Sequence, residues 1–142
     1  MQDCDDDLQQ SLETLDLMGE KLGALLFQFG YFNRTVFRSG GDFLVRLDPF
    51  LKKLPKRYKF AVEIRNKNWF SKPLFDLLRA HKVACALIDQ AWMPRVSEIF
   101  EKFDPITADF TYIRLLRDRK GIEEQTKIWD KVIVDRSKEL MN

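Results

Sequence analysis

The chain has 142 residues, of which 45% are hydrophobic and 32% charged, a composition typical of one globular domain with a substantial core. The formal net charge of +2 is too small to indicate nucleic acid or an anionic membrane as a partner. No apolar run is long enough to span a bilayer, and the acidic start MQDCDDD is unlike a signal peptide. These observations favour a soluble cytoplasmic protein.

Metal and disulfide chemistry find little support. The single histidine, His81, falls at the end of a predicted helix, where a cation suits the helix dipole. Cys4 lies in the acidic start and Cys85 in a predicted strand, so we expect no disulfide between them. One histidine and two distant cysteines do not make a zinc site, and we expect no metal and no cofactor.

The first part of the chain predicts a helix, a strand and a second helix. Apolar residues at helical spacing follow the acidic start up to Leu22, and Gly23 would end that helix. The run LLFQF at 25–29 predicts a strand buried on both faces, with Gln28 as its polar member. A helix is then expected over 42–54, in which Pro49 causes a kink or separates two short helices.

The stretch KFAVEIRNKNW at 59–69 predicts the second strand, over about 60–65. Its apolar residues alternate with a period of two, so Glu63 and Arg65 must share the opposite face. Two charged side chains on the inner face of a hydrophobic strand are costly unless they meet partners. Such a pair indicates either a binding site or a buried ion network.

The same alternation of strand and helix continues to the end. A helix is predicted over 71–81, a buried strand over 83–88 with Asp89 at its end, and a short helix over 96–103. A strand over 110–115 carries Arg114 near its end, and a last helix is predicted over 122–140. Buried strands that alternate with helices indicate a parallel sheet of right-handed βαβ units, an α/β fold.

The polar exceptions all fall late in their strands. Because the carboxyl ends of parallel strands form one ligand-binding face, these side chains should gather at one rim. The residues concerned are Gln28, Glu63, Arg65, Asp89 and Arg114.

Four segments together resemble the YecE-like family, a domain of unknown function that is similar to a TIM barrel. They are FAVEIRNKNW at 60–69, ALID at 86–89, DPITADFTYIRLL at 104–116 and DRKGIEEQ at 118–125. The resemblance covers nearly the whole chain and implies a (β/α)8-type fold, without implying an activity. Where the family often carries a His-Gly pair after the YxRL strand, this chain has Leu116 and Arg117, so an acid–base role of that histidine is not expected here.

The predicted barrel is incomplete. A full TIM barrel typically needs about 250 residues, and four βα units cannot close one. We therefore expect residues 1–142 to form a single, truncated barrel-like domain, the central part of the family's fold. Unpaired edges of such a sheet predict self-association with another molecule.

The late polar residues predict a site for a small molecule. Arg65 and Arg114 suit a phosphate or carboxylate, because guanidinium groups bind oxyanions in a bidentate manner. Glu63 and Asp89 are the candidate catalytic carboxylates, for acid–base work or for sugar hydroxyls, and Gln28 is a further binding candidate. Trp69 and Trp92 follow strands and could stack on a sugar or base.

A structural alternative pairs Glu63 with Arg65 and Asp89 with Arg114 as a neutralising network. For function, the preferred hypothesis is an enzyme that acts on a small polar or anionic substrate, sugar-derived or phosphorylated. The alternative is a non-catalytic module that binds a polyanion or a protein, suggested by the basic stretch KKLPKRYK at 52–59. This stretch precedes a strand and so lies at the opposite end of the sheet from the candidate site.

Overall fold

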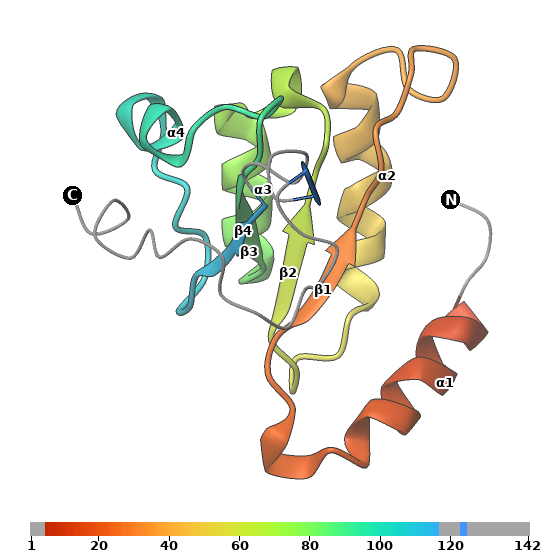
Figure 1. Cartoon of the computed structure of the whole chain (residues 1–142). Coiled ribbons are helices and arrows are strands. Elements are labelled where there is room, and N and C mark those ends of the chain that lie inside the picture. Colours follow the sequence, from red (N-terminus) through yellow and green to blue (C-terminus); the bar gives the residue numbers. More distant parts are fainter. Residues whose placement is uncertain (1–4, 117–122, 125–142) are drawn as a thin grey trace.

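The computed structural model describes residues 5–116 together with residues 123–124. Within this part of the chain, four strands form one parallel sheet. The strands are β1 (Leu25–Gln28), β2 (Phe60–Glu63), β3 (Ala84–Asp89) and β4 (Tyr112–Leu115). The α-helices are α1 (Asp5–Asp16), α2 (Gly40–Lys53), α3 (Lys72–His81) and α4 (Val96–Lys102), as shown in Figure 1. Short 3-10 turns span Gly19–Lys21 and Lys67–Trp69.

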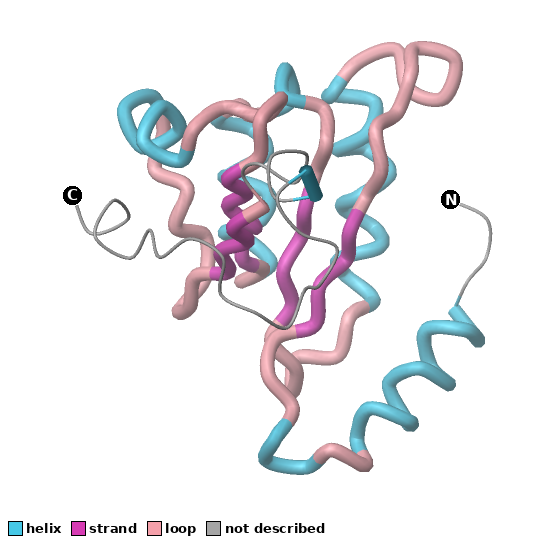
Figure 2. The backbone as a smooth tube through the Cα atoms, in the orientation of Figure 1, coloured by secondary structure: helices cyan, strands magenta, loops and turns pink. Residues whose placement is uncertain are grey.

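The order of the strands explains the shape of the sheet. The strands pair in chain order, β1-β2-β3-β4, so each crossover moves in the same direction and places its helix on the same face. Figure 2 shows the helices α2 and α3 behind the sheet, with the other face turned away from them. The result is a curled half-barrel, and the predicted partial (β/α)8 fold is confirmed.

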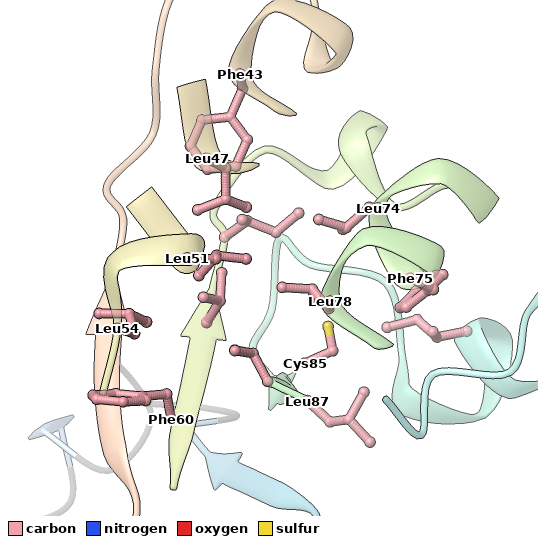
Figure 3. Close-up of a cluster of buried hydrophobic side chains, with 14 of the residues drawn as sticks. Phe43, Leu47, Leu51, Leu54, Phe60, Leu74, Phe75, Leu78, Cys85 and Leu87 are labelled. Atoms are coloured by element: carbon pink, nitrogen blue, oxygen red, sulfur yellow. The ribbon is translucent and has the colours of Figure 1, made fainter. Parts of the chain in front are cut away.

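The core lies between this sheet and its covering helices. Phe43, Leu47 and Leu51 point from α2 toward the strands, and Leu74 and Leu78 do so from α3 (Figure 3). They meet the side chains that alternate onto the helix-facing side of β2 and β3: Phe60, Val62, Cys85 and Leu87. This arrangement leaves residue Glu63 of β2 on the opposite face, the inner face of the half-barrel.

The first helix ends earlier than its apolar spacing predicts. α1 stops at Asp16, and Gly19 adopts a left-handed conformation with φ of 53° before a 3-10 turn begins. Only glycine takes this conformation without steric cost, so Gly19, and not Gly23, ends the helical path. Leu17 is consequently 87% exposed, although its neighbours in sequence follow helical spacing.

Pro49 lies inside one continuous helix, α2, so the alternative of two short helices is wrong. A proline in a helix frees the carbonyl of the residue four positions earlier, here Val45. Val45 is 73% exposed, so water can solvate that carbonyl and the helix tolerates the proline. The start of α2 is well fixed, because Ser39 and Asp42 form a reciprocal capping box.

A threonine completes the amino end of β3. Thr107 is buried, and its hydroxyl donates to the carbonyl of Val83 at 2.6 Å while accepting from the amide of Cys85 at 2.9 Å. Pairing between β3 and β4 begins only at Ala86 and Tyr112. The hydroxyl therefore satisfies backbone groups that β4 does not reach.

The remaining predicted elements agree with the structure to within a few residues at their ends. Apart from residues 123–124, which are helical, the predicted last helix over 122–140 lies outside the described residues, and so does Cys4. Within the described part of the chain, Cys85 is an unpaired thiol. A search of the same residues finds no helix with the length and hydropathy to cross a membrane.

Candidate functional site

Five polar side chains gather at the carboxyl ends of the strands, and we call them the rim cluster. They are Gln28, Glu63, Arg65, Gln90 and Arg114. Glu63 is the last residue of β2, and the register places Gln28 of β1 directly beside it. Arg65 follows Glu63 by two residues and so leaves the strand on the same face.

The inner face beneath the cluster is lined by small residues. Ala61, Ala84 and Ala86 alternate onto it from the two central strands, and all three are buried. Arg114 pairs in register with Ile88, and this places it two residue pairs beyond Tyr112 and Ala86 toward the carboxyl end, on the same face. Small side chains below the rim leave room for long polar side chains to converge above them.

Glu63 is the centre of the rim cluster. Its side chain is 0% exposed and lies between two guanidinium groups, with Oε1 2.6 Å from Nε of Arg65 and Oε2 2.6 Å from Nη1 of Arg114. The contact with Arg114 is a hydrogen bond. The contact with Arg65 has the distance of an ion pair but is misaligned for a hydrogen bond, so we treat it as Coulombic attraction.

Each arginine also has a glutamine partner. Nη1 of Arg114 donates to Oε1 of Gln28 at 2.9 Å, and Nη1 of Arg65 donates to Oε1 of Gln90. Gln90 follows Asp89 directly at the end of β3 and is a site residue that the sequence analysis missed. Its only sequence signal is a polar residue just after a strand, a position that loops commonly fill with polar residues.

The charges of the two arginines exceed that of their shared carboxylate. Two guanidinium groups contact one glutamate, and their side chains remain 15% exposed at Arg65 and 28% exposed at Arg114. Among the described residues, the Nη2 group of neither arginine has a hydrogen-bond partner. Within the part of the chain that the structure describes, the cluster therefore presents N–H donors without partners and more positive than negative charge at the rim, a combination suited to an oxyanion.

Asp89 takes a different position from the one expected. It is the last residue of β3 and pairs in register with Leu115, so it alternates with the core residues Cys85 and Leu87 toward the helix-facing side. Arg114 pairs with Glu63, and not with Asp89 as the structural alternative proposed. Asp89 is nevertheless half-buried at the strand end, beside the backbone of the site.

Trp69 lies in an aromatic layer between the helices and the loop after β1. Its ring stacks on Phe43 with centroids 4.9 Å apart and on Phe32 at 6.0 Å. A Cβ at Gly40 would come within 3.0 Å of the indole, so only glycine allows this close approach. The structure thus places Trp69 in the packing of α2, away from the contacts of the rim cluster, whereas Trp92 is 63% exposed in the loop after β3.

A second residue that the sequence analysis did not single out, Asn66, connects two loops beside the rim cluster. Asn66 is buried, and its carboxamide forms two hydrogen bonds with the backbone of Phe32, accepting from the amide at 2.9 Å and donating to the carbonyl at 2.8 Å. These bonds join the loop after β2 to the loop after β1. Asn66 therefore holds the backbone next to Arg65 in place.

The basic stretch at 52–59 is largely neutralised by acidic neighbours. Lys52 contacts Asp48, Lys53 contacts Asp5, and Arg57 contacts Asp16. Tyr58 also donates a hydrogen bond to the carboxylate that Arg57 contacts, and burial raises the pKa of its hydroxyl. This stretch fastens α1 to the amino end of the sheet.

Two hollows of the described surface lie away from the rim cluster. One, of about 440 Å³, is bounded by residues near the start of α2 that include Arg38 and Arg46, and the other, of about 260 Å³, lies at the amino end near Tyr58 and His81. Neither contains a residue of the rim cluster. These two hollows therefore have no part in the candidate site, whose chemistry follows from its converging charges.

His81 has a specific partner at the amino end. Its Nε2 lies 2.7 Å from Oδ1 of Asp48, whose other oxygen accepts from Lys52 at 2.6 Å. These two hydrogen bonds lower the pKa of the Asp48 carboxyl. The contact links α3 to α2, so the predicted role of His81 at a helix end extends to joining two helices. No group of His, Cys, Asp and Glu side chains suited to a metal ion occurs in the part of the chain that the structure describes.

The fold and the rim cluster define an α/β half-barrel with a buried carboxylate and two arginines at the carboxyl ends of its strands. Comparison with protein families agrees with the resemblance seen in the sequence. The chain matches the family described as "Protein of unknown function DUF72" over residues 1–140, and it belongs to that family. No curated protein and no solved structure matches the chain.

Proposed function

We propose that the protein is an enzyme that binds a small polar or anionic substrate at the carboxyl ends of its strands, with Arg65 and Arg114 as the binding groups. The observation that carries this proposal is the convergence of both arginines on the buried carboxylate of Glu63. Burying that charge is costly, and nothing in a purely apolar barrel face requires it. A carboxylate that fixes two guanidinium groups in one orientation is a common way to prepare an oxyanion site.

The two carboxylates expected to be catalytic do not act alike in this proposal. Both oxygens of Glu63 contact guanidinium groups, whereas a group that transfers protons needs an oxygen that reaches the substrate. We therefore assign Glu63 to positioning the arginines and assign no proton-transfer role to Asp89, because its side chain alternates toward the helix-facing side of β3. Trp92, exposed after the same strand, is kept as a proposed stacking surface for the substrate.

The alternative, a module that binds polyanions through residues 52–59, has less support. Lys52, Lys53 and Arg57 each contact a carboxylate, so much of their charge is compensated within the molecule. A polyanion would have to displace those carboxylates, at the end of the sheet opposite the rim cluster. A second copy of the chain at the open edges of β1 or β4 stays a prediction, testable by sedimentation at several protein concentrations.

Phosphate titration distinguishes the two functions. We expect binding to the wild-type protein, weakened at least about tenfold by Arg114→Lys, because lysine keeps the charge but loses the planar donor pair. The double variant Lys52→Ala/Lys53→Ala should bind phosphate like the wild type. Loss of binding in the lysine variant alone would assign anion binding to the amino end and overturn the proposal.

A further inference from the structure

The acceptor oxygens of the rim cluster all contact its own arginines, three through hydrogen bonds and Oε1 of Glu63 through an ion-pair contact. Both carboxylate oxygens of Glu63 contact guanidinium groups. The side-chain oxygens of Gln28 and Gln90 each accept from an arginine Nη1. Among the described residues of the cluster, every acceptor group therefore faces inward to a partner.

The groups of the rim cluster that have no partner among the described residues are hydrogen-bond donors. A carboxamide whose oxygen accepts from an arginine turns its NH₂ group to the other side, so Gln28 and Gln90 each present an amide donor. To these the arginines add their Nη2 groups, which have no partner in the described structure. Since arginine has no acceptor and each glutamine oxygen already accepts from an arginine, the four side chains around Glu63 offer mainly donors, together with the surplus positive charge.

We infer that the rim cluster selects a fully ionised oxyanion, a ligand that accepts hydrogen bonds at every oxygen and donates none, and that Gln28 and Gln90 set this selectivity. The inference rests on the proposed function and narrows its substrate class. A neutral sugar must donate from its hydroxyl groups, and in a donor-lined site those hydrogens lose their partners, at a cost in affinity. A sulfate, the dianion of a phosphate monoester or a carboxylate has no such loss.

The glutamines add to the selectivity that the arginines provide, because a carboxamide is always neutral and always keeps its NH₂ donor. A glutamate at position 90 would still accept from Arg65, so the contact that orients the guanidinium would survive. It would, however, replace a donor with an acceptor and cancel the surplus charge. The change Gln90→Glu therefore tests the polarity of the site without removing its arginines, and Gln28→Glu repeats the test from the neighbouring strand.

The experiment is calorimetric titration of sulfate, phosphate and mannitol into the wild-type protein and its variants at low ionic strength. We expect sulfate to bind and mannitol not to bind, and phosphate to bind more weakly as falling pH adds protons to it. Gln90→Glu and Gln28→Glu should weaken sulfate at least about tenfold, equivalent to about 1.4 kcal/mol. Gln10→Glu, the same charge change on the exposed face of α1, should leave sulfate binding unchanged. Urea midpoints of all variants establish that they fold.

The outcomes separate this inference from the proposed function. If mannitol binds as tightly as sulfate and both are lost in Arg114→Lys, the site is real but the donor-only selectivity is wrong. Sulfate binding that both glutamate variants leave intact, while Arg114→Lys abolishes it, overturns the role of the glutamines. If sulfate binds and Arg114→Lys has no effect, or if sulfate does not bind the wild type, the proposed function fails together with the inference.

Discussion

The replacement Glu63→Gln is the sharpest test of how the half-barrel tolerates a buried charge. Glutamine keeps the shape of the side chain but removes the only contacting carboxylate of Arg65 and Arg114 in the described structure. At 2.6 Å and an effective dielectric constant of 20, each pair contributes roughly 6 kcal/mol of attraction before the cost of desolvation is subtracted. Removing one partner of a buried pair typically costs about 3–5 kcal/mol.

The partial exposure of the arginines decides where in that range the result falls. Their side chains are 15% and 28% exposed, so water can stabilise the guanidinium groups once the carboxylate is gone. We therefore expect the free energy of unfolding to fall by about 3 kcal/mol, the lower end of the range. Urea unfolding at pH 7 and low salt, followed by circular dichroism, measures this change directly.

Asp76 of α3 provides the matched control. It also contacts two cationic side chains, Lys72 and Arg79, but it is 49% exposed. Asp76→Asn should cost at most about 1 kcal/mol, and added salt should shrink that cost while leaving the cost of Glu63→Gln nearly unchanged. Equal costs for the two variants would refute the reasoning, because they would show that burial does not strengthen the rim cluster.

Three further predictions concern the supports of the site and the core. Asn66→Ala removes two hydrogen bonds from a buried position, so it should lower the free energy of unfolding by about 1–3 kcal/mol. It should also speed hydrogen exchange at the amide of Phe32, and unchanged exchange would contradict the role of Asn66. Burial raises the pKa of the Cys85 thiol to about 12. In the variant Cys4→Ser, a thiol reagent at pH 8 should therefore react with Cys85 only after the protein unfolds. Rapid labelling of the folded protein would contradict the burial of this thiol. The lowered pKa of Asp48 means that its ionised carboxylate stabilises the fold at pH values above 3.8, the ordinary pKa of the group. The difference in stability between the wild type and Asp48→Asn should therefore persist at neutral pH and vanish as the pH falls below 3.8. A difference that grows in acid would contradict this sign.

The strands and their order could be predicted from the sequence because their signals are local. The alternation around Glu63 specifies which face its carboxylate occupies, and tertiary packing does not change a period of two. The same argument brought Arg65 to that face correctly. The apolar run at 83–88 likewise predicted a buried strand correctly, whereas the run at 25–29, predicted to be buried on both faces, is only half-buried because β1 is the first strand of the described sheet.

The partners within the site could not be predicted, because they depend on register and curvature. The spacing of the strands suggested an ion pair between Asp89 and Arg114. In the observed register the side chain of Asp89 lies on the opposite face of the sheet from Arg114, and Arg114 contacts Glu63 instead. Gln90 lies in a loop, where a polar residue carries no distinguishing signal. For Trp69, the aromatic partners come from segments about 26 and 37 residues away, and no local pattern encodes that stacking.

The hydroxyl of Thr107 has a consequence for how two neighbouring strands of the half-barrel can differ in where they begin. β3 begins before β4, and the backbone groups of Val83 and Cys85 lie in a buried position where no water can solvate them. Thr107 supplies both a donor and an acceptor to these groups, so one loop side chain stands in for the missing strand residue. The nearly isosteric change Thr107→Val would fill the same space but leave a buried amide and a buried carbonyl without partners, at a cost in stability.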